Sequence, residues 1–122
     1  MTIVQISDTH NYHRQLANLQ AADVLVHCGD FTDMGTEQEV LEFLNWLIEL
    51  PYKHKVFVTG NHDLCLWEAA DIEGLPSNVH FLQDRGCEIE GMKFYSLGYN
   101  HSEQLIPTDI DILVTHEPPC MI

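Results

Sequence analysis

The 122-residue chain is long enough for one small domain, and its 45% hydrophobic content is typical of a globular rather than a disordered protein. Five basic residues against 19 acidic ones give a formal charge of −14, which disfavours binding to duplex nucleic acid and to anionic membranes. No apolar run is long enough for a membrane helix, and the first residues read as a strand rather than a signal peptide. We therefore expect a cytoplasmic protein.

The first half of the chain predicts a βαβαβ order. Apolar runs indicate strands over residues 3–6, 23–28 and 55–59, and the spacing of Leu16 and Leu19 favours a short helix over residues 12–20 between the first two. Alternation of strands and helices is typical of parallel strands joined by right-handed crossovers.

A second, longer helix is predicted after residue 36. Thr36 and Glu39 have the spacing of a capping box, and Pro51 ends the helix. Its apolar side chains fall on one helical face. They are Val40, Leu41, Phe43, Leu44, Leu47 and Ile48.

The second half predicts short strands. These cover residues 79–82, 87–90 and 93–97, with a hairpin turn around Gly91, and a buried strand over residues 109–115. The fold class is therefore α/β, and we expect residues 1–122 to form a single domain. The four cysteines lack a C-x-x-C spacing, so we expect reduced thiols rather than a zinc ribbon.

Polar motifs follow four of the predicted strands. They are Asp8-Thr9-His10, Gly29-Asp30, Gly60-Asn61-His62-Asp63 and Thr115-His116. Each motif alone is more typical of a turn or a helix cap, but all four occupy the same position, where a strand gives way to a loop. Strand ends that meet at one sheet edge are where open α/β folds build their sites. Carboxylate, amide and imidazole ligands without thiolates suit Mn, Fe, Mg or Zn, so the pattern predicts a two-metal hydrolase site.

The spacing within these motifs suggests how the ligands divide between the metals. Side-chain alternation places Asp8 and His10 on the same side of the backbone, where they could bind one metal together. Asp30 follows a glycine that allows a sharp turn, so its carboxylate is free to bridge two ions. Asn61 offers a neutral carbonyl ligand, and His116 supplies an imidazole to the second metal.

The histidines outside the ligand set have more ordinary interpretations. We expect His62 to lie slightly outside the metal ligands, near a leaving group, with Asp63 hydrogen-bonded to it and fixing its tautomer. His27 is interpreted as a core residue or as one that supports the ligands. His13 and His54 are predicted to lie on the surface.

These motifs resemble the calcineurin-like metallophosphoesterase superfamily. The matching stretches are SDTHN, LVHCGDFTDMG, KVFVTGNHD and ILVTHEPP, and they look like its branch of small phosphodiesterases that act on cyclic nucleotides and model diesters. The resemblance runs from Ile3 to Pro119. It implies a four-layer αββα sandwich and two divalent metal ions, which can be Mn, Fe, Zn, Ni or Mg.

The resemblance also implies roles for individual residues. Metal one would take Asp8 and His10, metal two would take Asn61 and His116, and Asp30 would bridge them. His62 would be the acid or the phosphate-stabilising residue, with Asp63 orienting it. The superfamily pattern ends in G-H-x-H, which gives one histidine to each metal and does not occur in this sequence. We therefore expect a sandwich that is incomplete at its C-terminus.

The predicted function is hydrolysis of a phosphodiester or phosphomonoester by a metal-activated water, on a small substrate such as a cyclic nucleotide. The alternative is a catalytically weak or inactive scaffold that binds metal or a protein partner, and a third interpretation is a fragment of a longer enzyme. An open sheet edge would favour association into a homo-oligomer.

Overall fold

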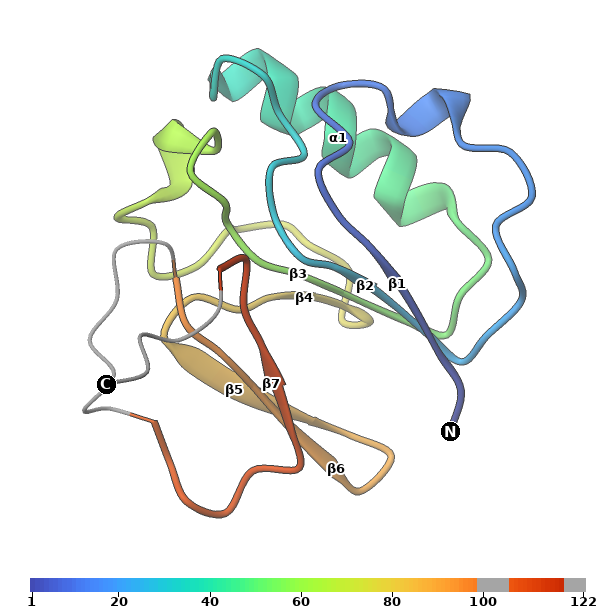
Figure 1. Ribbon diagram of the computed structural model, residues 1–122, viewed down its shortest axis with the longest axis vertical. Coiled ribbons are helices and arrows are strands. Elements are labelled where there is room, and N and C mark those ends of the chain that lie inside the picture. The colour runs from blue at the N-terminus through green and yellow to red at the C-terminus, as the bar shows by residue number, and fades with distance from the viewer. Residues whose placement is uncertain (99–105, 118–122) are drawn as a thin grey trace.

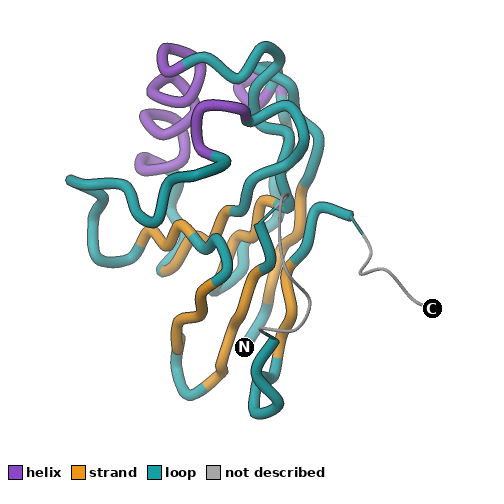
Figure 2. Tube along the Cα trace, turned by 90° about the vertical axis from the view of Figure 1, so that its left-hand side faces the viewer, coloured by secondary structure: helices purple, strands orange, loops and turns teal. Residues whose placement is uncertain are grey.

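Two β-sheets and one layer of helices make up the protein in the computed structural model, which describes residues 1–98 and 106–117 (Figure 1). The first sheet lies between the helices and the second sheet, and the helices gather on one side of the molecule (Figure 2). The α/β class is therefore confirmed. Three of the four layers of the predicted αββα sandwich are present, and within the two described ranges no helix covers the outer face of the second sheet.

The first sheet consists of four parallel strands in the order β1-β2-β3-β4. The strands are β1 (Ile3–Ile6), β2 (Val24–His27), β3 (His54–Phe57) and β4 (Val79–Phe81). All residues of β2 are buried, as expected for a parallel strand covered on both faces. Because the strands run in one direction, the loops after β1, β2 and β3 start from the same edge of the sheet.

The second sheet has the order β5-β6-β7. Its strands are β5 (Arg85–Ile89), β6 (Met92–Ser96) and β7 (Ile112–Val114). The pairing of β5 with β6 is antiparallel, which confirms the predicted hairpin, and β7 runs parallel to β6. The strand predicted over residues 109–115 is shorter than expected and only partly buried, since Leu113 remains 38% exposed.

Helix α1 (Glu37–Glu49) begins as its sequence predicts. The hydroxyl of Thr36 accepts a hydrogen bond from the backbone N–H of Glu39 at 3.2 Å, and the Glu39 carboxylate accepts one from the backbone N–H of Thr36 at 3.1 Å. This confirmed capping box satisfies two donors at the start of the helix. The buried face is narrower than predicted, because Leu41 is 55% exposed and Ile48 is also exposed.

The predicted helix over residues 12–20 is wrong. Only a 3₁₀ turn, η1 (His13–Gln15), forms there, because Leu16 is extended and Asn18 has a left-handed backbone with φ of 64°. The surface position predicted for His13 is also wrong. Its ring is fully buried under α1, against Phe43 and Trp46. A second 3₁₀ turn, η2 (Leu64–Leu66), follows β3.

Apolar side chains fill both faces of the first sheet. Leu25 and Phe57 face the helices, and Val26 and Val56 face the second sheet, so successive strand residues alternate between two cores. Within the described residues, no helix has the length and apolar character needed to span a bilayer. Cys28, Cys65 and Cys87 are free thiols, and Cys120 lies outside the described residues.

Candidate metal centre

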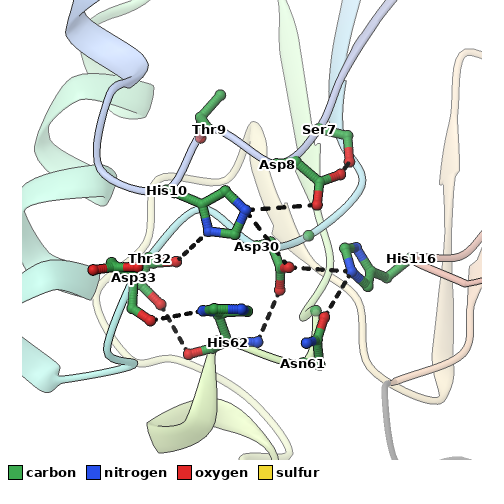
Figure 3. A network of polar contacts seen from close by, with 12 residues as sticks. Ser7, Asp8, Thr9, His10, Asp30, Thr32, Asp33, Asn61, His62 and His116 are labelled. Carbon is green, nitrogen blue, oxygen red and sulfur yellow. Dashed lines mark hydrogen bonds and ion pairs between the residues drawn. The ribbon is translucent and has the colours of Figure 1, made fainter.

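Four loops bring polar side chains together at one edge of the two sheets (Figure 3). Asp8 and His10 come from the loop after β1, Asp30 from the loop after β2, and His62 from the loop after β3. The loop after β3 also supplies Asn61. The fourth loop follows β7 and supplies His116, which lies next to Asn61.

The loop after β1 runs alongside the loop after β2. The backbone N–H of Asp8 donates to the carbonyl of Gly29 at 2.9 Å, and that of His10 donates to the carbonyl of Asp30 at 3.0 Å. Asp8, His10 and Asp30 have left-handed backbones, with φ of 56°, 42° and 58°. This conformation is uncommon for residues other than glycine, and it concentrates at functional sites, where surrounding contacts enforce it.

Asp30 occupies the centre of the group and is only 3% exposed. One carboxylate oxygen, Oδ1, accepts a hydrogen bond from the backbone N–H of His62 at 2.8 Å. The other, Oδ2, lies 3.4 Å from Nε2 of His116 and 3.8 Å from Nε2 of His10. A single carboxylate therefore faces imidazoles on two sides, which is the arrangement that a bridging ligand requires.

Three imidazoles of the site share one feature, a contact between Nδ1 and a backbone carbonyl. The pairs are His10 with Thr32 (3.2 Å), His62 with Asp33 (2.7 Å) and His116 with Cys28 (2.8 Å). A carbonyl can only accept, so Nδ1 must carry the hydrogen and the Nε2 lone pair is left free. Such outer hydrogen bonds are typical of metal-binding histidines, because they fix the tautomer and the ring orientation.

The acidic and imidazole ligands form two groups that could each hold a metal ion, and both contain Asp30. One is His10, Asp30 and His62, and the other is Asp8, Asp30 and His116. Within each group the ligand atoms lie within 4.8 Å of one another. Carboxylate and imidazole donors with this spacing fit Mn, Fe, Zn or Mg. These groups pair Asp8 with His116 and His10 with His62, but Nε2 of His10 also lies 3.7 Å from Oδ1 of Asp8, so the pairing of Asp8 with His10 on one metal stays a prediction.

Asn61 belongs with His116. Its amide oxygen lies 3.0 Å from Nε2 of His116, and both atoms are acceptors. Turning the amide over would let its nitrogen donate to that Nε2 and to both carboxylate oxygens of Asp30. In the orientation drawn, the two facing lone pairs of Asn61 and His116 could instead bind one cation between them. The amide oxygen of Asn61 therefore fits the role of a metal ligand.

Asp63 does not orient His62, contrary to the sequence-based prediction. Its fully buried carboxylate accepts hydrogen bonds from Asp30, Thr32 and Gly60, and the Nδ1 of His62 donates instead to the Asp33 carbonyl. The reason is geometric, because the side chain of Asp63 turns back toward the loop after β2.

His62 is partly exposed, and its ring lies edge-on to that of His10 with centroids 4.8 Å apart. The hydrogen bond to the Asp33 carbonyl raises the pKa of His62, and the carboxylates of Asp30, Asp33 and Asp63 add to the increase against the opposing effect of burial. The ring can therefore act as a cation ligand through Nε2 or, when protonated, as a donor to a bound anion.

Two glycines allow these loops to approach each other. A Cβ on Gly29 would lie 2.8 Å from the Gly60 nitrogen and 2.8 Å from Nδ1 of His116. A Cβ on Gly60 would lie 2.2 Å from Oδ1 of Asp30. The Gly-Asp and Gly-Asn pairs predicted as turns are thus also points of contact between loops.

Two residues in the site were not singled out from the sequence. Thr9, between Asp8 and His10, has a buried hydroxyl, and Thr32, two residues after Asp30, is fully buried. Both are threonines within two residues of a proposed ligand, which is a signal that could have identified them.

Comparisons with known proteins identify the family of this chain. The family model described as calcineurin-like phosphoesterase matches residues 1–119. Similar curated proteins include a UPF0046 protein of Caenorhabditis elegans, 34% identical over 98% of this chain and 51% of its own length. The human metallophosphoesterase domain-containing protein 1 is 30% identical over 95% of this chain and 48% of its own length.

The chain spans about half the length of the curated relatives it matches. The family match nevertheless covers nearly the whole chain and includes all four loops of the site. The chain therefore belongs to the calcineurin-like phosphoesterase family.

Proposed function

We propose that this chain binds two divalent metal ions, with Mn²⁺ the first candidate, and hydrolyses a small phosphodiester or phosphomonoester. One observation carries the proposal: two groups of ligands share Asp30, and every imidazole in them is held by a carbonyl at Nδ1 so that its Nε2 is unprotonated. When bound, two divalent ions would activate a water and neutralise the charge that develops on the phosphoryl oxygens.

The chain's own residues would orient the reactants. Asp30, nearly inaccessible to water, fixes the spacing of the two ligand groups through its two oxygens. Asp8, Asn61 and His116 surround one position, and His10 and His62 face the other. Because Asp8 and Asn61 are exposed, the site is open on one side to a substrate phosphate.

We assign His62 a hydrogen bond to the phosphoryl or leaving oxygen, as the sequence suggests. Its place in a ligand group supports a second role as a metal ligand. The variant His62→Ala, which keeps neither a ligand atom nor a donor, separates the two, because a lost ligand would weaken Mn²⁺ binding, whereas a lost donor would reduce hydrolysis and leave Mn²⁺ binding intact. Calorimetry on the metal-free protein and turnover on the loaded protein measure the two effects.

The substrate class follows from charge. A chain with a formal charge of −14 repels extended polyanions, so a small phosphoester such as a cyclic nucleotide is favoured over duplex nucleic acid.

The direct test is hydrolysis of bis(p-nitrophenyl) phosphate with added Mn²⁺. We expect activity in the wild type and its loss in Asp30→Asn, with Tyr12→Phe, which alters an exposed aromatic side chain, as the control. A wild-type protein that binds Mn²⁺ and melts cooperatively but does not hydrolyse this diester or p-nitrophenyl phosphate would leave a scaffold that binds metal or a partner.

Association into a homo-oligomer and a cytoplasmic location remain predictions. Strand β1 is an edge strand of the first sheet in the described structure, and its first residue, Ile3, is 40% exposed. Such an edge can pair with a second chain. Light scattering at several protein concentrations would decide whether it does.

A further inference from the structure

A fully buried histidine lies beneath the metal centre without facing it. His27, the last residue of β2, packs its ring against Phe31 and Phe43. Its Nδ1 accepts a hydrogen bond from the backbone N–H of Gly29 at 3.1 Å, and its Nε2 lies 2.8 Å from the hydroxyl of Thr9. A backbone N–H can only donate, so Nδ1 is unprotonated and Nε2 donates to Thr9.

This pair of hydrogen bonds connects two ligand loops. Thr9 stands between Asp8 and His10 in the loop after β1, and Gly29 immediately precedes Asp30 in the loop after β2. One buried ring therefore contacts both loops. Burial lowers the pKa of His27 to about 3, so the ring is neutral and keeps both hydrogen bonds at physiological pH.

A fully buried carboxylate makes the corresponding connection between the loops after β2 and β3. Oδ1 of Asp63 accepts from the backbone N–H and the hydroxyl of Thr32, at 3.0 and 2.7 Å. Oδ2 accepts from the backbone N–H groups of Asp30 and Gly60, at 2.8 and 2.9 Å. Both oxygens face only donors, which suits the ionised carboxylate.

Neither group is free to bind a metal ion. The two oxygens of Asp63 are each occupied by two hydrogen bonds, and both ring nitrogens of His27 are engaged. Both side chains have no exposed surface. Instead, His27 and Asp63 form hydrogen bonds with residues close to the ligands in the sequence. Asp63 also accepts one from the backbone N–H of Asp30, which is itself a proposed ligand.

We propose that His27 and Asp63 are positioning residues that hold the loops after β1, β2 and β3 at the spacing the metal ions require. The inference rests on the proposed metal site. The loops they connect contain the left-handed residues Asp8, His10 and Asp30, a conformation that persists only where neighbouring contacts enforce it. Loss of either connection would let these backbones relax and would move ligand atoms away from Asp30.

The experiment uses two variants that remove one hydroxyl each. Thr9→Val deletes the partner of His27, and Thr32→Val deletes one donor to Asp63. The control, Tyr52→Phe, also removes one hydroxyl from a buried residue, since Tyr52 donates to the Gln20 carbonyl at 2.7 Å. Tyr52 precedes β3 and so lies at the opposite end of the sheet from the ligands.

Mn²⁺ alone is titrated calorimetrically into metal-free protein, and unfolding in urea is followed in EDTA. We expect both threonine variants to weaken Mn²⁺ binding by about tenfold or more, as for other groups that support metal ligands. The control should bind Mn²⁺ like the wild type. All three variants should unfold cooperatively, with comparable losses of stability in EDTA.

A second comparison tests His27 directly. His27→Gln keeps a carbonyl that can accept from Gly29 and an amide that can donate to Thr9, whereas His27→Leu keeps neither. The glutamine variant should retain more Mn²⁺ affinity than the leucine variant at matched stability.

Wild-type Mn²⁺ affinity in both threonine variants would overturn the proposal, and so would equal weakening by Tyr52→Phe or equal affinity of the two His27 variants. These outcomes are separate from a failure of the proposed function, which would show as Mn²⁺ binding by the wild type without hydrolysis. A wild-type protein that binds no Mn²⁺ would overturn both.

Discussion

The loop after β3 and the β5–β6 hairpin both contain a glycine, but they need it for different reasons. In the hairpin, Glu90 and Gly91 have left-handed backbones with φ of 50° and 84°, and a Cβ on Gly91 would meet nothing within 4 Å. In the loop after β3, a Cβ on Gly60 would lie 2.2 Å from Oδ1 and 2.5 Å from the backbone nitrogen of Asp30.

The difference shows that the hairpin turn depends on local interactions, whereas the loops of the metal centre depend on contacts between distant parts of the chain. The hairpin turn is determined by its own residues, since a left-handed pair suits the twist of the two flanking strands. The loops of the metal centre depend on one another, because each stays in place through contacts to a loop far away in the sequence. Substitutions should therefore affect the two regions on different scales.

The largest effect is expected from Gly60→Ala. The added methyl group would force the loops after β2 and β3 apart, so we expect loss of Mn²⁺ binding and a decrease of about 3 kcal/mol in the free energy of unfolding. Calorimetry and urea unfolding in EDTA measure the two quantities. If Mn²⁺ still bound with unchanged affinity, the close approach of these loops would not be needed for the site.

Removal of the shared ligand should come next. Mn²⁺ at about 100 times its Kd should stabilise the wild type by about 2.7 kcal/mol, because only the folded chain offers the assembled ligands. Asp30→Asn should abolish this increase, since both ligand groups contain Asp30. Melting temperatures with Mn²⁺ and with EDTA test this, and an unchanged Mn²⁺ effect in the variant would exclude a bridging role.

A smaller effect is expected at Glu39, which joins the segment after Asp30 to α1. Its carboxylate accepts from the backbone of Asp33, Met34 and Thr36. Partial burial favours the protonated form, but hydrogen bonds from Asn11 and from these backbone groups outweigh it and lower the pKa of Glu39 to about 2.

Since the folded-state pKa is below the unfolded one, Glu39 contributes stability above about pH 4.5, and this contribution is lost as pH falls toward 2. We expect Glu39→Gln to lower the free energy of unfolding by about 1.5 kcal/mol at pH 7, a value discounted for solvent screening. The variant should also show a weaker pH dependence of stability than the wild type between pH 4.5 and 2. Urea unfolding across this range measures it. Parallel pH profiles of variant and wild type would contradict the assignment.

The smallest effect is expected from Gly91→Ala. With open space around the site, the substitution costs only the left-handed conformation, about 1 kcal/mol, and should leave Mn²⁺ affinity unchanged. A change in affinity would show that the hairpin and the metal centre are coupled, and would contradict the view that the hairpin turn is determined by its own residues alone.

The elements that could be predicted from the sequence are those with local signals. The capping box of Thr36 and Glu39 placed the start of α1, and the apolar runs placed β1 and the hairpin strands within one or two residues. The positions of Asp8, Asp30 and His116 at strand ends were also predictable, since parallel strands end at one edge.

The errors arise where distant residues decide the outcome. His13 lies in a polar stretch, but α1 covers it, so its burial depends on residues about thirty positions further along the chain. Asp63 is adjacent to His62 in the sequence, yet its carboxylate is bound by donors of the loop after β2. Sequence adjacency shows which side chains are neighbours, but not the direction in which they point.

One contact of the site has a consequence for folding kinetics. The hydrogen bond from His116 to the Cys28 carbonyl joins residues 88 positions apart and links the second sheet to the first. Long-range contacts of this kind form late in folding, because the loop they close is entropically costly. A metal ion bound through His116 would then bind only after the rate-limiting step of folding. It would therefore slow the unfolding of the chain and leave the folding rate nearly unchanged.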